Sequence, residues 1–310
     1  MNEPLIVQRD AFFNALYKIF KKDKNTMLIS ADNGAKGMDK ISELSGQFRN
    51  VGIAEEQAVG MACGYALQGK KVWAYAIDPF ITLRCLEFVK LDVCAMNLPI
   101  TLLGVGSGYA YDVMGPTHHA VGVVAAMRVW PNLTIWSPAD NMTAEALAEI
   151  SYNHNAPQYI RFDRGYLPNL HKNEQINFLD GVMVALEGKD LAIIATGIMV
   201  HQAIKVASEL EKNGISAKVI DLFRLKPINK NILFNYLETV KGVVTLEEDF
   251  LAGGMSSAIA ELFVDNGFKK PLLRIGQGDL FVFDLGGREA IWKKYGFDVQ
   301  DIAEKILKWY

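Results

Sequence analysis

The sequence has few cysteines, little net charge and no long apolar run. Its 310 residues include only three cysteines, with no CxxC pair, which excludes a disulfide framework or zinc ribbon and indicates a reducing cytosol. The formal net charge of -3 gives no basic field for nucleic acid. The N-terminus lacks a leader's apolar segment, and glycines and Pro99 interrupt the longest uncharged stretch, residues 93–111. We therefore expect a soluble, cytoplasmic protein that binds neither nucleic acid nor membrane.

Common nucleotide-binding motifs are also missing. There is no GxxxxGK[ST] sequence, which excludes P-loop chemistry. The cluster Gly104-Val105-Gly106-Ser107-Gly108 follows an expected strand, but Tyr109 stands where a dinucleotide fingerprint needs its next glycine. Gly253-Gly254 precedes an expected helix, where a tight turn is the commoner use and an anion site the alternative.

Alternation of strands and helices dominates what is present. Hydrophobic residues make up 50% of the chain, and short apolar runs alternate with segments of helical spacing in both halves. This pattern predicts an α/β protein with two doubly wound, mainly parallel-sheet domains. We expect a first domain over residues 1–165, a linker over 166–178 and a smaller domain over 179–310. Expected strands cover 26–30, 72–77, 99–105, 133–136, 158–162, 190–195, 216–220 and 242–246.

Two helices of the first half bear on function. The segment 80–92 reads as one regular helix. Glu55 and Glu56 open a helix over 55–68 whose next residues are almost all apolar or small. Acids at a helix N-terminus are explained by the helix dipole alone. Beside so apolar a helix, however, we expect one of the two carboxylates to face inward and to need a partner.

Polar residues in two loops suggest further site positions. His118 and His119 are adjacent, so they cannot share the i, i+4 face of a metal-binding helix, and we expect no metal site there. The preceding Gly115-Pro116-Thr117 resembles an active-site loop on a rigid scaffold. Arg161 and Arg164 flank Asp163 at a strand end, which fits a surface ion pair or an anion site at the carboxyl edge of a parallel sheet.

Together these segments resemble the C-terminal half of the transketolase family. The resemblance covers nearly the whole chain, in order and at the family's spacing. It rests on the segments 50–60 (GIAE followed by AVG), 115–118 (GPTH), 130–140 (PNL and SPAD), 164–168 (Arg-x-x-Leu-Pro), 225–227 (LKP), Glu247 with 253–254, and 278–279 with 295–296.

The resemblance implies a thiamine-diphosphate-dependent enzyme with a pyrimidine-binding domain and a transketolase C-terminal domain. The family's GDG…N motif, which grips the diphosphate through Mg²⁺, is absent from this sequence. The chain therefore looks like one subunit of a split enzyme, with the Mg²⁺ ligands on a separate N-terminal subunit. Family assembly implies that two copies associate and that the partner completes an α2β2 heterotetramer.

The resemblance also implies roles for individual residues. Glu55 resembles the glutamate that bonds the aminopyrimidine and favours the tautomer that removes the thiazolium proton, a step that needs a dry pocket. Phe80 resembles the aromatic that packs on the pyrimidine, and Asp32 is placed among the cofactor-binding residues. His118 resembles the histidine near the donor's carbonyl, and Arg164 an arginine that holds a distal phosphate. Further substrate contacts are expected from Arg161, Lys36 and Asp112.

Several positions depart from the family pattern. Met114 stands where transketolases carry an acid that reads a sugar hydroxyl, and Asp112 lies two residues earlier. Lys36 replaces a phosphate-contacting serine, Gly106 replaces a histidine, and Leu83 stands where an arginine is frequent. Because methionine is a poor hydrogen-bond acceptor, we expect weaker dependence on that hydroxyl and a deoxy or otherwise modified sugar as a candidate substrate.

The leading hypothesis is a transketolase-like transferase that moves a two-carbon ketol unit from a ketose to an aldehyde with a partner subunit. The alternative within the enzyme class is a carboligase subunit like 1-deoxyxylulose-5-phosphate synthase, whose loop also reads GPTHH, as His119 does here. A regulatory, non-catalytic paralogue and an isolated thiamine-binding module are alternatives from other classes. Retention of both Glu55 and His118 argues against the regulatory paralogue.

Overall fold

The computed structural model describes residues 6–32, 34–170 and 176–310. The chain divides into two compact units. The first comprises the residues up to Ser107 and Met127–Leu179, and the second Gly108–Ala126 and Asp180–Tyr310. Each unit is an α/β sandwich, which confirms the predicted fold class. Residues 171–175 of the expected linker lie outside the described residues.

A parallel sheet forms the centre of the first unit. Its strands run in the order β5-β6-β4-β3-β1-β2, and every pair among them is parallel. Most of these strands are buried on both faces, which is why the sequence shows them as continuous apolar runs. Their bounds are Thr26–Ser30 (β1), Phe48–Asn50 (β2), Lys71–Ile77 (β3), Ile100–Val105 (β4), Thr134–Trp136 (β5) and Gln158–Phe162 (β6).

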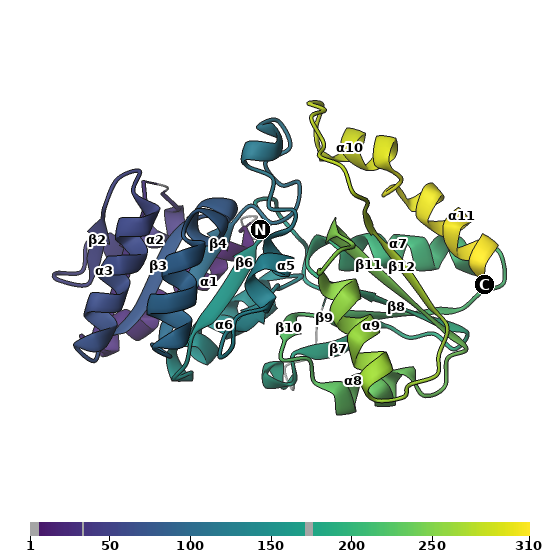
Figure 1. Ribbon diagram of the computed structural model, residues 1–310, viewed down its shortest axis with the longest axis horizontal. Helices are drawn as coiled ribbons and strands as arrows, with labels where there is room; N and C mark the ends of the chain where they lie inside the picture. Colours follow the sequence, from purple (N-terminus) through teal and green to yellow (C-terminus); the bar gives the residue numbers. More distant parts are fainter. Residues whose placement is uncertain (1–5, 33, 171–175) are drawn as a thin grey trace, which may run out of the picture. The chain divides into compact units, whose positions relative to one another are not determined.

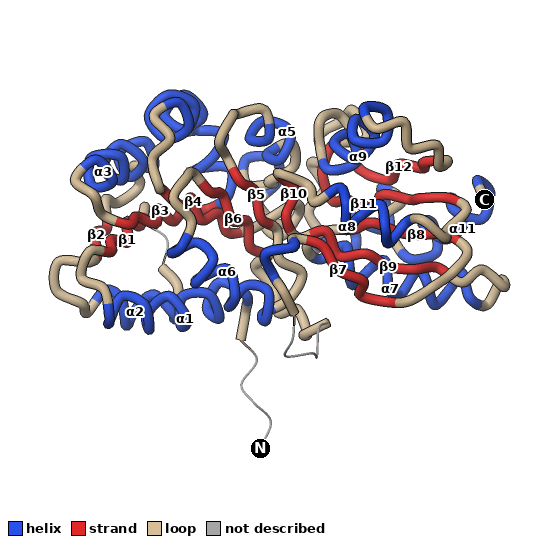
Figure 2. Tube along the Cα trace, turned by 90° about the horizontal axis from the view of Figure 1, so that it is seen from below, coloured by secondary structure: helices blue, strands red, loops and turns tan. Residues whose placement is uncertain are grey.

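Helices cover both faces of this sheet (Figures 1 and 2). One face carries α1, α2 and α6, and the other carries α3 and the helical segment after β3. Asp140 begins α6 as its N-cap, accepting a 2.8 Å hydrogen bond from Thr143 N. The bounds are Gln8–Lys22 (α1), Lys36–Ser42 (α2), Glu55–Leu67 (α3), Leu86–Phe88 (α4), Val123–Arg128 (α5) and Asn141–Asn153 (α6).

The segment after β3 is not the single regular helix expected over 80–92. It begins with a π-helical turn, Phe80–Arg84 (η1), passes through α4, and continues as a second π-helical stretch, Val89–Ala95 (η2). A π turn holds more residues than an α turn, which changes the direction in which successive side chains point. Apolar spacing does not distinguish this geometry from a regular helix.

The second unit has a mixed sheet in the order β12-β11-β8-β9-β7. All its pairs are parallel except β7 with β9. Strand β11 continues four residues beyond the expected end at Leu246, because the acids that follow are buried with partners distant in sequence. The bounds are Val182–Leu186 (β7), Leu191–Ala195 (β8), Ala217–Leu222 (β9), Gly242–Phe250 (β11) and Leu272–Gln277 (β12), with a short strand at Arg224–Lys226 (β10).

Helices again cover both faces in the second unit. Helices α7 and α11 pack against one another on one face, while α8 and α9 lie on the other (Figure 1). This follows from right-handed crossovers, because the step from β8 to β9 runs opposite to the steps from β9 to β11 and β12. The bounds are Ile198–Glu211 (α7), Lys230–Leu237 (α8), Met255–Asp265 (α9), Arg288–Tyr295 (α10) and Val299–Trp309 (α11), with 3₁₀ turns at Gly115–Thr117 (η3) and Phe178–Asp180 (η4).

Candidate active site

The candidate residues of the first unit share one edge of its sheet. Asp32 and Lys36 follow β1, Glu55 follows β2, and Phe80 follows β3. Arg161 lies near the end of β6, and Arg164 follows it. Because these strands are parallel, their carboxyl ends lie at the same edge, which is where open α/β sheets bind ligands.

Glu55 is the centre of a charged and aromatic cluster. It begins α3, and it is only 3% exposed, so it is the inward-facing carboxylate that the sequence predicted. Arg84 Nη1 donates to Glu55 Oε2 at 2.5 Å. The Arg84 guanidinium also lies over the Phe80 ring, 4.1 Å from its centroid. A buried carboxylate, a cation and an aromatic face thus meet at the start of α3.

Sequence reasoning did not select Arg84. It noted only that Leu83 occupies a position where an arginine is frequent in the family. The π turn η1 places the side chains of Phe80 and Arg84 one above the other, which a regular helix read from the sequence would not indicate. The available signal was chemical, because an inward-facing Glu55 beside an apolar helix requires a cationic or hydrogen-bonding partner.

Asp32 and Lys36 lie in the exposed loop and first turn after β1. The backbone of Asp32 has a φ of 59°, in the left-handed region, and its N–H donates to Asn50 Oδ1 at 3.3 Å. The same oxygen accepts from Gly52 N at 2.9 Å, so Asn50 ties the loops after β1 and β2 together. Lys36 is the first residue of α2 and is exposed.

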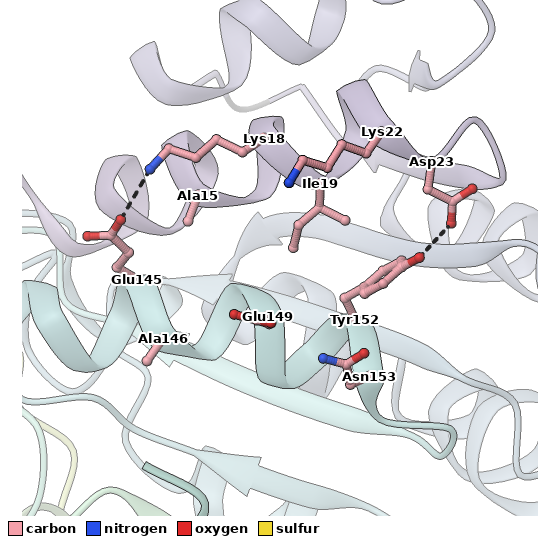
Figure 3. A pocket seen from close by; sticks show the side chains of 10 residues that line it. All are labelled: Ala15, Lys18, Ile19, Lys22, Asp23, Glu145, Ala146, Glu149, Tyr152 and Asn153. Carbon is pink, nitrogen blue, oxygen red and sulfur yellow. Dashed lines mark hydrogen bonds and ion pairs between the residues drawn. The ribbon is translucent and has the colours of Figure 1, made fainter. Parts of the chain in front are cut away.

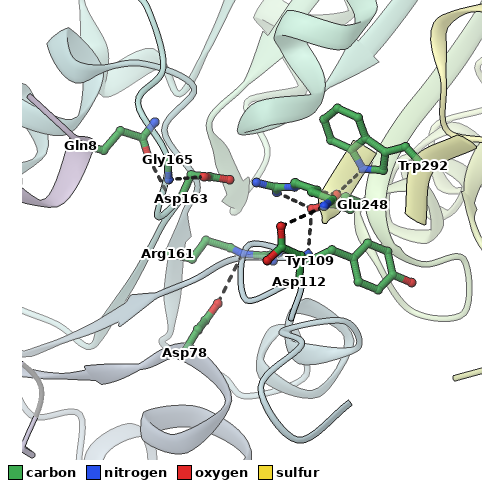
Figure 4. Close-up of polar contacts among 10 residues, drawn as sticks. Gln8, Asp78, Tyr109, Asp112, Arg161, Asp163, Gly165, Glu248 and Trp292 are labelled. Atoms are coloured by element: carbon green, nitrogen blue, oxygen red, sulfur yellow. Dashed lines mark hydrogen bonds and ion pairs between the residues drawn. The ribbon is translucent and has the colours of Figure 1, made fainter. Parts of the chain in front are cut away.

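The two arginines near β6 differ in their surroundings. Arg161 is 5% exposed, and its Nε lies 3.8 Å from Oδ2 of the fully buried Asp78 (Figure 4). The hydroxyl of Tyr159 donates to the other oxygen of Asp78. Arg164, in contrast, is exposed. Of the pair, only Arg164 presents its side chain at the surface, whereas Arg161 belongs to a buried ion pair.

The loop that carries both histidines packs within the second unit. His118 is half-buried, with Thr117 Oγ1 2.9 Å from its Nδ1 and the ring of Tyr111 5.7 Å away. Asp112, a predicted substrate contact, accepts a hydrogen bond from Arg288 N at 2.9 Å. The segment therefore lies against the start of α10, a contact that its place between β4 and β5 in the sequence did not indicate.

His119 is the more buried of the two histidines, with 6% exposure. Its ring meets Tyr109 edge-on at 4.9 Å, and its Nε2 lacks a hydrogen-bond partner among the residues described. It lines a cavity of about 20 Å³ together with aromatic and aliphatic side chains of the second unit. Burial lowers the pKa of His119, and the nearby carboxylates of Glu248 and Asp112 oppose that shift.

Other features of the chain do not add to this site. A surface pocket of about 460 Å³ lies between α1 and α6, where Lys18 pairs with Glu145 and Tyr152 donates to Asp23 (Figure 3), but it contains no candidate residue. All three cysteines are free and buried, and burial raises the pKa of Cys63 and of Cys85 to about 12. Over the described ranges, no group of three or more His, Cys, Asp or Glu side chains could hold a metal ion.

Comparison with known proteins identifies the family. Residues 6–169 match the transketolase pyrimidine-binding domain, and residues 181–302 match the transketolase C-terminal domain. The chain belongs to the transketolase family. It is 31% identical to a subunit of the apulose-4-phosphate transketolase of Phocaeicola vulgatus, over 99% of both chains.

Two further relatives show how family members are divided. A split-gene transketolase, solved as an inactive beta4 tetramer, superposes with a TM-score of 0.86 at 30% identity, covering 98% of this chain and 97% of that one. The 1-deoxy-D-xylulose-5-phosphate synthase of Caldanaerobacter subterraneus subsp. tengcongensis is 33% identical over 97% of this chain but only 48% of its own length. This chain thus corresponds in extent to one subunit of a split transketolase.

None of the helices in the part of the chain described here is both long and apolar enough to cross a bilayer. This agrees with the family assignment, which rests on two α/β domains.

The lowered pKa of His119 leads to a prediction about stability. In the unfolded chain this histidine should titrate near its ordinary pKa of about 6.5. As pH falls below about 6.5, the unfolded chain takes up a proton that folded His119 resists, so the free energy of unfolding should fall. His119→Asn should flatten this decline between about pH 7 and pH 5.5, as measured by urea denaturation. His154→Asn is the control, and equal slopes for wild type and His119→Asn would contradict the prediction.

Proposed function

We propose that this chain is the pyrimidine-binding subunit of a split, thiamine-diphosphate-dependent transketolase. With its partner it transfers a two-carbon ketol unit from a ketose to an aldehyde acceptor. The observation that carries the proposal is the buried cluster of Glu55, Arg84 and Phe80 in a chain that matches a subunit of a two-chain transketolase along nearly its whole length.

The cluster suits an aminopyrimidine ring. Glu55 offers a carboxylate shielded from water, and Phe80 offers an aromatic face to a planar heterocycle. Bound thiamine diphosphate supplies the carbanion that attacks the donor's carbonyl. Glu55 hydrogen-bonds the ring and controls its protonation, while Arg84 holds the Glu55 side chain in place. Asp32, at the end of the neighbouring strand β1, contributes to the same cofactor site.

The remaining candidate residues serve the sugar. His118 stabilises charge at the donor's oxygen atoms, and the exposed Arg164 binds a phosphate or a similar anion, with Lys36 as a second cation. The P. vulgatus relative is named for a phosphorylated substrate, which supports an anionic one here. Because Arg161 and Asp112 already bond to Asp78 and Arg288, we assign them supporting positions behind the substrate contacts.

A partner subunit completes the enzyme. The proposed partner carries the diphosphate-binding domain and the Mg²⁺ ligands, and two copies of each chain form an α2β2 heterotetramer. The beta4 tetramer of the split-gene relative supports self-association of chains of this type. The cytoplasmic location indicated by the cysteine content stays a prediction.

A second candidate is a carboligase subunit that first decarboxylates a 2-oxo acid. Its support is the 33% identity to a 1-deoxy-D-xylulose-5-phosphate synthase and the adjacent pair His118-His119. A panel of donors separates the two, because release of CO₂ from a 2-oxo acid in place of ketol transfer would favour the carboligase.

Reconstitution tests the function directly. The chain alone should show no turnover of ketoses, since it lacks the diphosphate-binding half. Addition of a subunit with the GDG…N motif, thiamine diphosphate and Mg²⁺ should produce ketol transfer, measured by product analysis. Light scattering should report two copies of each subunit. Tight cofactor binding and full turnover by the chain alone would contradict the proposal.

Substitution of Glu55 tests the cofactor site. Glu55→Gln keeps the shape of the side chain but removes its ionisable carboxyl, so kcat of the reconstituted enzyme should fall about 10²–10⁴-fold. The matched control is Glu56→Gln, which changes the same charge at the half-buried next residue and should be mild. If the control is the damaging variant, the wrong carboxylate has been assigned to the cofactor.

Arg164 tests recognition of an anion. Arg164→Ala should raise KM for a ketose phosphate about 10–100-fold, the range expected for lost hydrogen bonds to a charged group. The KM for the matching neutral ketose should change little. Arg49→Ala, an exposed arginine of β2, is the control. Equal effects on charged and neutral substrates would exclude Arg164 from anion binding.

A further inference from the structure

Three consecutive acids at the end of β11 are all buried. Glu247, Glu248 and Asp249 have exposed fractions of 1%, 6% and 2%. Adjacent acids in a strand point to alternate faces, so each needs its own partners. Glu247 accepts hydrogen bonds from Met255 N and Ser256 N, at 2.7 and 2.9 Å, and thereby caps α9. The other two acids bind a different part of the chain.

Glu248 holds the beginning of the segment 108–122, which we call the histidine loop. Its Oε2 accepts from Tyr109 N at 2.9 Å (Figure 4). The same carboxylate accepts from Arg288 Nε at 2.9 Å, from a second nitrogen of that guanidinium and from Trp292 Nε1. Gly108 has a φ of 58°, and a Cβ there would collide with Oε2, so the carboxylate and the loop backbone are closely fitted.

Asp249 holds the end of the same loop. Its Oδ1 accepts from Gly122 N and, at 2.8 Å, from Phe250 N. The two ends of the loop also meet one another, because Ala120 N donates to Gly108 O at 2.8 Å in an isolated antiparallel bridge. The loop is thus closed at its base, and two neighbouring carboxylates of β11 bind the two ends.

Additional contacts hold the body of the loop to the second unit. Tyr109 packs with Val282 and Ile291 in a buried cluster, and its hydroxyl donates to Gln277 Oε1 at 2.8 Å. Asp112 accepts from Arg288 N at the start of α10. His118 lies on this loop between the two bound ends, so displacement of either end would displace its imidazole.

We propose that Glu248 and Asp249 are positioning residues for the histidine loop, which bind its two ends to the C-terminal domain and thereby fix the place of His118. The proposal rests on the role of His118 in the proposed function. It gives the C-terminal domain a direct part in the reaction, because the loop that it holds carries a group that meets the substrate. A misplacement of about 1 Å can cost 10²-fold in rate.

The chemistry of the two acids predicts different responses to conservative changes. Both oxygens of Glu248 accept, from four N–H donors in all, so Glu248→Gln turns one acceptor into a donor that faces other donors. Asp249 serves Gly122 and Phe250 through one oxygen, so Asp249→Asn keeps that acceptor whereas Asp249→Ala removes it. Glu247→Gln is the matched control, because Glu247 does not bond the loop and burial already raises its pKa.

Amide hydrogen exchange measured by NMR tests the binding of the loop without reference to activity. Glu248→Gln should speed exchange at Tyr109, and Asp249→Ala at Gly122, at least about tenfold. Asp249→Asn should stay near wild type, and so should Glu247→Gln. If Glu248→Gln fails to fold, Asp249→Ala tests the other end. Unchanged exchange at both ends, or equal changes in the control, would overturn the proposal.

Kinetics of the reconstituted enzyme then test the consequence for His118. Glu248→Gln and Asp249→Ala should lower kcat about 10–100-fold. The Kd for thiamine diphosphate should be unchanged, and Asp249→Asn should restore kcat. If the wild-type enzyme lacks ketol transfer, the proposed function fails while the exchange results stand. If exchange rises in the variants but kcat does not fall, the loop is held as described and the positioning role is wrong.

Discussion

A carboxylate removed from water needs a cation or several N–H donors around it, and in this chain an arginine meets that need at three places. Removing one partner of such a buried pair costs about 3–5 kcal/mol, so each pair constrains the elements that carry it. One pair orients the start of α3, one holds the end of β6, and one holds the histidine loop on the second unit. The pairs are Glu55 with Arg84, Asp78 with Arg161, and Glu248 with Arg288.

These pairs also separate residues that support the site from residues that face a ligand. Arg161 and Arg164 are three residues apart, yet one is buried against Asp78 and the other is exposed. Asp112 and His118 share a loop, yet Asp112 is bonded to the backbone of α10 and His118 is half-buried. The supporting residues carry charge because they must hold backbone and side chains in one arrangement, and they are as much part of a working site as the contacts themselves.

Local patterns predicted much of the fold and part of the candidate site. Helix α11 and strands β1 and β6 have the bounds that periodicity indicated, because each is set by its own apolar spacing. The inward-facing Glu55 followed from an acid that opens an apolar helix. The sequence did not reveal the π turns after β3, since apolar spacing cannot distinguish them from α-helix, nor the buried end of β11, since its acids read as the end of a strand.

The sequence by itself determined the family, the two α/β domains and the residue types at the carboxyl edge of the first sheet, because motifs and periodicity are local properties. Only the tertiary structure decided which charges are paired. Arg84 reaches Glu55 across 29 residues, Arg288 reaches Glu248 across 40, and Glu248 reaches Tyr109 across 139. Such partners are brought together by the packing of strands and helices distant in sequence, and no local pattern records which buried carboxylate will meet which donor.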